Sequence, residues 1–293
     1  MTAFFPTITI VTPSYNQGAF IEETIVSVLD QQYPKLEYLI IDGGSTDESV
    51  EIIRRYSKYL SFWESTPDRG QSHAINKGFA RSTGAILGWL NSDDLYMPGT
   101  LAQIHPILQE ADLVFGNCWH LQEKQSETES LRSDVAEKMQ RVSLVNEDYI
   151  IQPSTFWTRR AWGQTGPLRE DLHFAFDWEW FLRAEQQKLK FQYVDDCLSV
   201  YRLHESHKTG TGGSARQQEI LHIYEQYAPR LALLYGMLRE EDLALRDFTT
   251  HWKAKVHTLL HGTSSRAALL KTLHPEKYEA YTEAEVEGCW CML

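Results

Sequence analysis

The sequence has 293 residues, which is enough for one large α/β domain with an appendage and for a core that needs no disulfide bonds. Its formal net charge of −12 excludes binding of polymeric nucleic acid, because such proteins gather lysines and arginines against the phosphates. The four cysteines lack the spacing of a structural zinc site, so we expect reduced thiols.

The first residues lead directly into an apolar run. Met1 to Pro6 are too few to form a secretory leader, and no stretch approaches 18 uninterrupted apolar residues. We therefore expect a cytoplasmic protein, with peripheral contact at a membrane as an open alternative.

Strand and helix patterns alternate in the first third of the chain. Strands are expected at 7–12, 37–41, 60–64 and 85–90, and helices at 19–31, 47–56 and 72–80. This alternation predicts an α/β fold of the Rossmann-like type, with a mostly parallel central sheet and helices on both faces.

The pattern is less regular further along. It predicts a strand at 113–119, a polar hairpin and loop up to about 150, a strand at 149–157, a helix at 176–187 and a strand at 191–201. A glycine-rich linker at 210–214 then divides the chain into a domain at 1–210 and a helical extension at 211–293.

Polar residues directly follow three predicted strands. They are Thr12-Pro13-Ser14-Tyr15-Asn16, Asp42-Gly43-Gly44-Ser45-Thr46-Asp47 and Asn91-Ser92-Asp93-Asp94. Ligands of open α/β sheets bind at the carboxyl ends of strands, so these turns are the first candidates for a site.

Asp93 and Asp94 place two adjacent carboxylates at the end of a buried strand. Because adjacent acids repel one another, a site that keeps both ionised usually supplies a cation, and oxygen ligands suit Mg²⁺ or Mn²⁺. The alternative is that one of them caps a helix beginning near Pro98. Asp42 is not needed as a cap and is expected to accept hydrogen bonds from a base or ribose.

These turns, together with later motifs in a consistent order, resemble glycosyltransferase family 2. The later motifs are Asp68-Arg69-Gly70-Gln71 with Ala74-Ile75-Asn76-Lys77-Gly78, then Gln152-Pro153-Ser154, Phe176-Asp177-Trp178-Glu179 and Tyr201-Arg202-Leu203-His204. The resemblance covers about the first 210 residues. It implies the GT-A fold, a nucleotide-sugar donor, a Mn²⁺ or Mg²⁺ cofactor and a hexosyltransferase-type activity.

The resemblance also implies roles for the residues that match. The nucleobase would be bordered by Thr12, Pro13 and Tyr15 and bound by Asp42. Asp68 and Arg69 would lie beside the base or the diphosphate. Asp93 would contact the donor ribose or the metal. The metal would be held by Asp94 as main ligand, and His204 would reach the metal or the diphosphate. His207, three residues further on, is expected at the surface.

Asp177 matches the general base of inverting family members. A carboxylate at the start of a helix is also a routine partner of the helix dipole, and Glu179 is the substitute candidate for the base. Trp178 and Trp180 either stack on sugars or belong to the core.

The chain departs from the usual motifs at several positions. Many family members have an acid where Gly43 and Asn91 stand, Asp or Tyr at His73, and Glu at Phe176. Asp42, Asp93 and Asp94 are retained.

The leading hypothesis is inverting transfer from a nucleotide sugar, with UDP as the expected nucleotide, to a hydroxyl of a glycan or lipid-linked acceptor in polysaccharide biosynthesis. A sugar-nucleotide nucleotidyltransferase would carry a basic phosphate loop after the first strand, whereas residues 12–18 contain no Lys or Arg. A catalytically degenerate protein that binds nucleotide or glycan is the non-enzyme alternative.

Residues 215–293 lie outside the resemblance. Their apolar spacing predicts amphipathic helices that pack on the first domain or on one another. Glu240, Glu241 and Asp242 oppose contact with anionic headgroups, although peripheral membrane contact and a homodimer through this segment both stay open.

Overall fold

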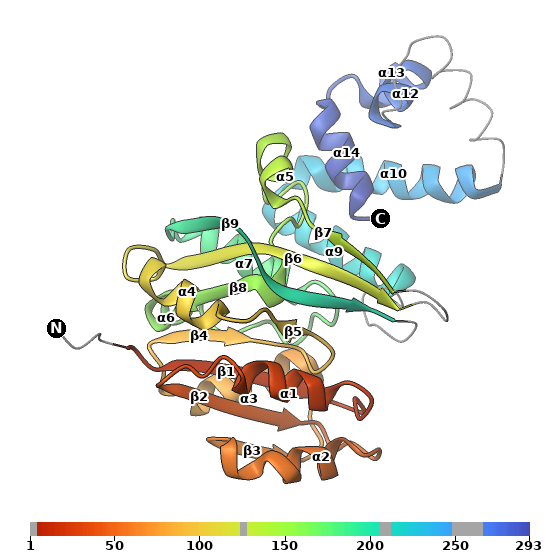
Figure 1. Ribbon diagram of the computed structural model, residues 1–293. Helices are drawn as coiled ribbons and strands as arrows, with labels where there is room; N and C mark the ends of the chain where they lie inside the picture. The colour runs from red at the N-terminus through yellow and green to blue at the C-terminus, as the bar shows by residue number, and fades with distance from the viewer. Residues whose placement is uncertain (1–4, 124–127, 205–211, 248–265) are drawn as a thin grey trace. The chain divides into compact units, whose positions relative to one another are not determined.

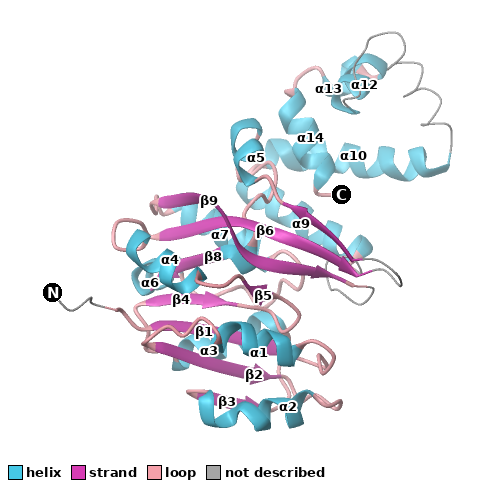
Figure 2. Ribbon diagram, viewed as in Figure 1, coloured by secondary structure: helices cyan, strands magenta, loops and turns pink. Residues whose placement is uncertain are grey.

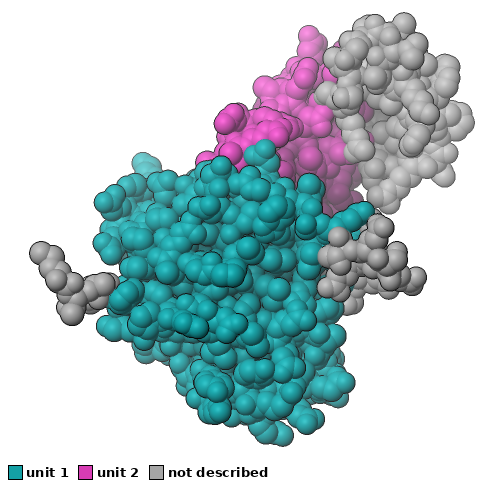
Figure 3. Space-filling view, viewed as in Figure 1, with its two compact units in different colours: residues 1–135, 150–211 teal, residues 136–149, 212–293 magenta. Residues whose placement is uncertain are grey.

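The computed structural model describes residues 5–123, 128–204, 212–247 and 266–293. The chain forms two compact units (Figure 3). The first contains residues 1–135 and 150–211, and the second contains residues 136–149 and 212–293. The second unit therefore includes a short internal segment that the predicted division near residue 210 assigns to the first domain.

The first unit is built on one mixed sheet (Figures 1 and 2). Its strands are β1 (Ile8–Ser14), β2 (Leu36–Asp42), β3 (Phe62–Ser65), β4 (Ile86–Trp89), β5 (Leu95–Tyr96), β6 (Leu113–Glu123), β7 (Thr128–Arg132), β8 (Thr155–Thr158) and β9 (Phe191–Leu203). They lie in the order β3-β2-β1-β4-β8-β6-β9-β5, and β7 pairs with β6. The alternating strands and helices predicted for the first ninety residues or so are confirmed.

The strands of the first half, β3, β2, β1 and β4, are mutually parallel. Ser14 at the end of β1 lies in register with Asp42 at the end of β2, and Asp42 with Ser65 at the end of β3. The three loops that follow these strands therefore leave the sheet at the same edge.

Helices cover both faces of this sheet. They are α1 (Ile21–Leu29), α2 (Ser49–Tyr56), α3 (Gln71–Arg81), α4 (Thr100–Ile107), α6 (Arg159–Thr165) and α7 (Phe176–Gln186). Helices α1, α2 and α4 bury isoleucines against Ile8, Ile10 and Ile40 of the sheet. Helix α3 packs closely on the strands, because a Cβ at Gly78 would lie 2.5 Å from Val11.

Tryptophans form the core beneath α6 and α7. The ring of Trp157 lies 4.8 Å from that of Trp180 and 5.2 Å from that of Trp89, and Trp178 is also fully buried. Trp178 and Trp180 are thus core residues, and their faces are not open to a sugar.

The second half of the sheet differs from the prediction in detail. The expected strand at 149–157 is a short 3-10 turn, Gln152–Ser154, followed by β8, which runs antiparallel to β4 and β6. Pro153 explains the difference, because proline donates no ladder hydrogen bond and favours a turn. Strand β5 and helix α6 were not predicted.

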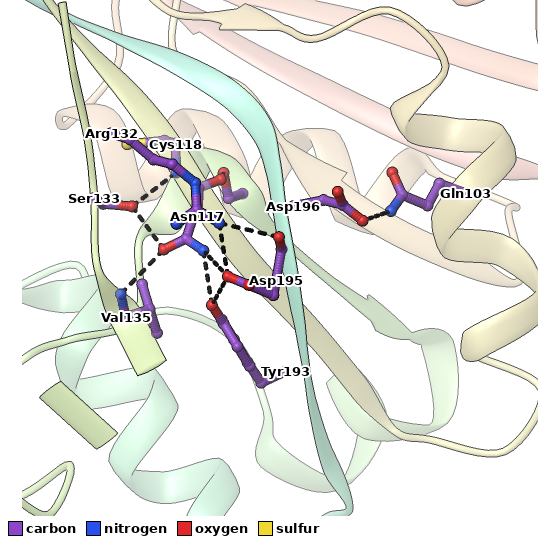
Figure 4. A network of polar contacts seen from close by, with 10 residues as sticks. Gln103, Asn117, Cys118, Arg132, Ser133, Val135, Tyr193, Asp195 and Asp196 are labelled. Carbon is purple, nitrogen blue, oxygen red and sulfur yellow. Dashed lines mark hydrogen bonds and ion pairs between the residues drawn. The ribbon is translucent and has the colours of Figure 1, made fainter. Parts of the chain in front are cut away.

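A polar cluster joins β6, β7 and β9 around the buried side chain of Asn117 (Figure 4). Its amide donates to Tyr193 Oη at 2.7 Å and to Asp195 at 3.1 Å, and its oxygen accepts from Ser133 Oγ and Val135 N, both at 3.0 Å. The ladder between β6 and β9 shifts register on both sides of Asn117. The cluster satisfies the polar groups that this irregularity would leave unpaired.

The second unit is helical and contains α5 (Val135–Arg141) apart from its first residue. Its helices are α9 (Gly213–Tyr227), α10 (Pro229–Asp247), α12 (Arg266–Leu273), α13 (Pro275–Tyr278) and α14 (Glu283–Cys291). Ile220, Tyr224, Leu234 and Val286 are buried, as the predicted amphipathic patterns require. In the part of the chain that the structure describes, no helix combines the length and apolar character needed to cross a membrane.

Candidate active site

The loops after β1 and β2 are tied to each other by hydrogen bonds. Asn16, in the left-handed region with φ of 52°, accepts at Oδ1 from Thr46 N at 2.9 Å and donates from its backbone N to Ser45 Oγ at 2.8 Å. Gly18 N donates to Asp47 Oδ2 at 2.8 Å. The two loops form one rim, from which the Tyr15 side chain projects with 62% exposure.

Thr12 and Pro13 lie beneath this rim. Both are buried, and the Thr12 hydroxyl lies 3.0 Å from Tyr38 Oη inside the sheet layer. Of the residues expected to border a base after β1, Tyr15 is the one that faces solvent.

Asp42 is buried and bonded within its own loop. Its Oδ2 accepts from Ser45 N at 2.8 Å, Gly44 N at 3.1 Å and Ser65 Oγ at 2.7 Å, and Oδ1 accepts from Ser45 Oγ at 2.5 Å. From its place at the strand end, this carboxylate is predicted to be free for a base or ribose. Instead it orders the glycine-containing turn, because the short side chain at a strand end reaches the backbone amides that follow it.

Asp68 and Arg69 occupy the turn after β3, beside the loop after β2. Asp68 Oδ1 accepts from Gly70 N at 2.8 Å, and a Cβ at Gly43 would lie 2.8 Å from Asp68 Oδ2. Arg69 is exposed and donates from Nε and Nη2 to one oxygen of Glu170.

Glu170 is a contact that sequence reasoning missed. Asn76 Nδ2 of α3 also donates to it at 3.2 Å, and these bonds from Arg69 and Asn76 outweigh its burial and lower its pKa. An isolated glutamate 101 residues from Arg69 carries no periodic or spacing signal.

The turn after β4 brings Asp93 and Asp94 into different surroundings. Thr24 Oγ1 of α1 donates to the carbonyls of Ser92 and Asp94 at 2.9 and 2.8 Å, which fixes the turn. Asp94 is 1% exposed, and its carboxylate accepts from Arg202 N and from Asn91 Nδ2, both at 3.3 Å. Burial, followed by the neighbouring charge of Asp93, raises the pKa of Asp94 well above its usual range.

Neither acid caps the helix that follows. Helix α4 begins at Thr100 with Gly99 as its N-cap, and the side chain that bonds to its first turn is that of Gln31, whose Oε1 accepts from Leu101 N at 3.2 Å. The capping alternative for Asp93 and Asp94 is therefore wrong.

Asp93 faces His204, which comes from the end of β9. His204 Nε2 lies 3.2 Å from Asp93 Oδ2, and the two side chains are 14% and 20% exposed. Phe20 at the start of α1 packs against the imidazole with ring centroids 4.5 Å apart. The fold thus brings a carboxylate and an imidazole, 111 residues apart in the chain, together at the same sheet edge.

Asp177 lies in the first turn of α7 and is partly exposed, with Trp178 N donating to its Oδ1 at 2.9 Å. Glu179, the substitute candidate, is fully buried and accepts from Arg183 Nε at 2.9 and 3.1 Å. Arg183 also donates to the carbonyls of Thr165 and Pro167, so Glu179 belongs to the internal scaffold of α7. Asp177 is the acid of this helical turn that solvent reaches. His207 lies outside the described residues.

The model of the family described as glycosyl transferase family 2 matches residues 9–165, which is more than half of the chain. The chain belongs to this family. The match begins in β1 and ends with α6, so it includes the loops after β1, β2, β3 and β4.

Two curated family relatives illustrate the range of the likeness. The putative teichuronic acid biosynthesis glycosyltransferase TuaG of Bacillus subtilis is 33% identical over 120 residues, which cover 39% of this chain and 47% of TuaG. The PGL/p-HBAD biosynthesis glycosyltransferase of Mycobacterium bovis is 28% identical over 204 residues, covering 67% of this chain and 77% of that protein. The chain spans about half the length of TuaG.

Solved structures that share this fold are GT-A glycosyltransferases. TarS 1–349 of S. aureus in complex with UDP-GlcNAc has a TM-score of 0.62 at 17% identity, covering 77% of this chain and 66% of that one. The mannosyltransferase PcManGT of Pyrobaculum calidifontis, in complex with GDP-Man and Mn²⁺, has a TM-score of 0.62 at 20% identity, covering 98% and 86%. The GT-A fold expected from the sequence is confirmed.

Proposed function

We propose that this family 2 protein transfers a sugar, with inversion, from a UDP sugar to a hydroxyl of a glycan or lipid-linked acceptor in the cytoplasm. The observation that carries the proposal is the pair of Asp93 and His204, which meet at 3.2 Å beside the loops that follow the parallel strands. Family relatives named for teichuronic acid and PGL/p-HBAD biosynthesis favour such acceptors.

Asp93 and His204 fit a divalent cation. One carboxylate and one imidazole are too few to enclose an ion, and among the described residues no cluster of three or more potential ligand side chains occurs. That suits Mg²⁺ or Mn²⁺, which complete their coordination with substrate phosphates and water, and an imidazole favours Mn²⁺ of the two. When bound, the cation supplies charge stabilisation to a departing nucleoside diphosphate.

In our proposal, Asp94 positions Asp93 and His204 and does not bind the metal itself. Its buried carboxylate holds the turn against β9 through Arg202 N, and β9 in turn carries His204. The family resemblance implies Asp94 as the main metal ligand. The exposure of Asp93 and its distance to His204 favour Asp93 for that role.

The donor nucleotide would lie across the rim formed by the first loops. Tyr15 is exposed and offers a ring face to the base, while buried Thr12, Pro13 and Asp42 shape the floor from below. Arg69 keeps most of its guanidinium surface open to solvent, with 68% of its side chain exposed, and would meet the diphosphate.

Asp177 would act as the general base. Its side chain is partly exposed, and its bond from Trp178 N orients it at the start of α7, from where it would take the proton of an acceptor hydroxyl. The base takes the hydroxyl proton as the acceptor oxygen attacks the anomeric carbon from the side opposite the leaving diphosphate.

Replacing Asp177 with Asn tests the enzymatic proposal. We expect Mn²⁺-dependent release of UDP from a UDP sugar, with water in place of the acceptor, to fall by about 10²- to 10⁴-fold, because the proton acceptor is lost. Affinity for UDP should stay within about twofold, since Asp177 makes no contact with the nucleotide in this account.

The matched control is Glu185→Gln, which removes an exposed carboxylate from the same helix and should retain the wild-type rate. Equal rates for wild type and Asp177→Asn would reject Asp177 as the base. An equal loss of UDP release in both variants would show that the negative charge of α7, and not a proton acceptor at Asp177, determines the rate.

A further inference from the structure

Three amide side chains from distant parts of the sequence meet beside the turn that carries Asp94. Gln71 is the first residue of α3, Asn91 lies just after β4, and Gln152 is the first residue of the 3-10 turn before β8. Gln71 Nε2 donates to Asn91 Oδ1 at 2.7 Å. Asn91 Nδ2 donates to Gln152 Oε1 and to Asp94 Oδ2, both at 3.3 Å. Gln71, Asn91 and Gln152 are called the amide network below.

The direction of these hydrogen bonds is set by Gln152. This side chain is buried, and its Nε2 donates to the backbone carbonyl of Trp89 at 2.9 Å. Because a carbonyl only accepts, Gln152 turns its amide nitrogen to Trp89 and its oxygen to Asn91. Asn91 must then present its nitrogen to Gln152, and the second proton of that nitrogen is directed to Asp94.

Asp94 connects the amide network to the proposed metal pair, Asp93 and His204. The Asp94 carboxylate accepts from Asn91 on one oxygen and from Arg202 N of β9 on the other. Asp93 precedes Asp94 in the turn, and His204 lies two residues after Arg202. A turn that loses the bond from Asn91 can move relative to β9, and the distance between the two members of the metal pair then changes.

We propose that Gln152 and Asn91 are positioning residues that hold the metal pair at the separation a divalent cation requires. This inference rests on the proposed function. Asn91 suits the role because its nitrogen supplies two protons. A carboxylate at position 91 would face two acceptors, Gln152 Oε1 and Asp94 Oδ2, and when ionised would have no proton for either. The amide at position 91, where many family members have an acid, is thus matched to Gln152.

Two substitutions of Gln152 test this role through the affinity for Mn²⁺, measured by calorimetry in the presence of UDP. Gln152→Met removes both polar groups at similar size, so we expect Mn²⁺ affinity to fall about tenfold at every pH. Gln152→Glu reproduces the hydrogen-bonding pattern of the amide only while its carboxyl is protonated. In that form its O–H donates to Trp89 O, and its other oxygen accepts from Asn91.

The dependence on pH separates a positioning role from a general loss of stability. Burial at position 152 and the charge of Asp94, which shares Asn91 with this position, both disfavour the ionised form of the new carboxyl. We expect the Mn²⁺ affinity of Gln152→Glu, divided by that of the wild type at the same pH, to fall about fivefold as the pH rises from about 5.5 to about 8. Gln109→Glu, at an exposed position after α4, adds the same charge and should keep a constant ratio.

Thermal midpoints without nucleotide and metal show which variants are folded. If Gln152→Met does not fold, Gln71→Leu, at a partly exposed position, replaces it, since it removes the bond to Asn91 Oδ1 and should also lower Mn²⁺ affinity. Wild-type Mn²⁺ affinity in the folded variant overturns the positioning role, and so does a Gln152→Glu ratio that stays at the level of Gln152→Met at every pH. Both of these outcomes leave the proposed function intact. A wild type that binds no Mn²⁺ in the presence of UDP overturns the proposed function and this inference together.

Discussion

Asp93 and Asp94 show how two identical side chains at neighbouring positions acquire different environments. Asp94 points into the protein, where Arg202 N and Asn91 complete its bonds, whereas Asp93 lies beside His204 with a fifth of its side chain exposed. The sequence predicts that a pair of acids ends this strand. Which of the two faces the site depends on β9, more than a hundred residues away, and no local pattern encodes that.

Manganese affinity separates the two acids. We expect Asp93→Asn to lower Mn²⁺ affinity, measured by calorimetry in the presence of UDP, at least tenfold more than Asp94→Asn does. The physical reason is that Asp93 is the carboxylate that pairs with His204, while Asp94 acts on the turn. The reverse order, with the larger loss in Asp94→Asn, would restore Asp94 as the main ligand.

The environment of Asp42 also depends on contacts that the local sequence does not predict. Its place at the end of β2 follows from the apolar run before it, and its loop leaves the sheet beside the loop after β1. Its bonds to Ser45 and Ser65 were not evident, because one partner lies in the following turn and the other on β3. Sequence located the loops, but tertiary contacts decide which side chains in them are available.

At the scale of elements, the first parallel strands were predictable and the second half of the sheet was less so. The early strands are buried on both faces and appear as apolar runs, whereas short β5 gives no such signal and the strand predicted at 149–157 begins several residues before β8. Strand β5 has two residues and exists through its pairing with β9. The polar cluster around Asn117 likewise joins β6, β7 and β9 through contacts that no single segment reveals (Figure 4).

Asn117→Ala tests how much this cluster holds the second half of the sheet. We expect the free energy of unfolding, measured in denaturant, to fall by about 2–4 kcal/mol, because buried Val135 N and the Tyr193 hydroxyl each lose a partner. Gln103→Ala removes an exposed bond to Asp196 in the same region and should change stability by less than about 0.5 kcal/mol. Equal effects of the two substitutions would contradict a structural role for the cluster.

The free energy of unfolding of the whole molecule depends on pH, and the Glu37 carboxyl contributes to that dependence. Burial alone would raise the pKa of this carboxyl, but hydrogen bonds from Thr9, Thr83 and Gly84 outweigh burial and lower it below its usual 4.5. The unfolded chain therefore takes up this proton at a higher pH than the folded chain does. The stabilisation is fully present above the usual pKa and is lost as the pH falls through the lowered value.

We expect the free energy of unfolding of the wild type to fall as the pH drops below about 4.5, and to fall less steeply for Glu37→Gln. The variant should be less stable than the wild type at neutral pH, because an amide replaces the hydrogen-bonded carboxylate. Denaturant unfolding at a series of pH values measures both. Parallel pH profiles for the two proteins would show that Glu37 does not contribute.

The whole chain combines a GT-A unit of glycosyltransferase family 2 with a separate helical unit. The apolar spacing of residues 215–293 predicted helices, whereas the inclusion of residues 136–149 in the second unit was not predictable from sequence. That segment follows β7 in the chain but packs in the core of the other unit, with Tyr224 Oη donating to Asn146 O at 2.6 Å.

The thermal unfolding midpoint, measured with a panel of nucleotide sugars in the presence and absence of Mn²⁺, tests the central claim most directly. We expect at least one UDP sugar to raise the midpoint of the wild type when Mn²⁺ is present, and Asp93→Asn to lose this rise while remaining folded. A panel in which no nucleotide sugar shifts the wild-type midpoint, or in which the shift is the same without Mn²⁺, would contradict a metal-dependent glycosyltransferase site at Asp93 and His204.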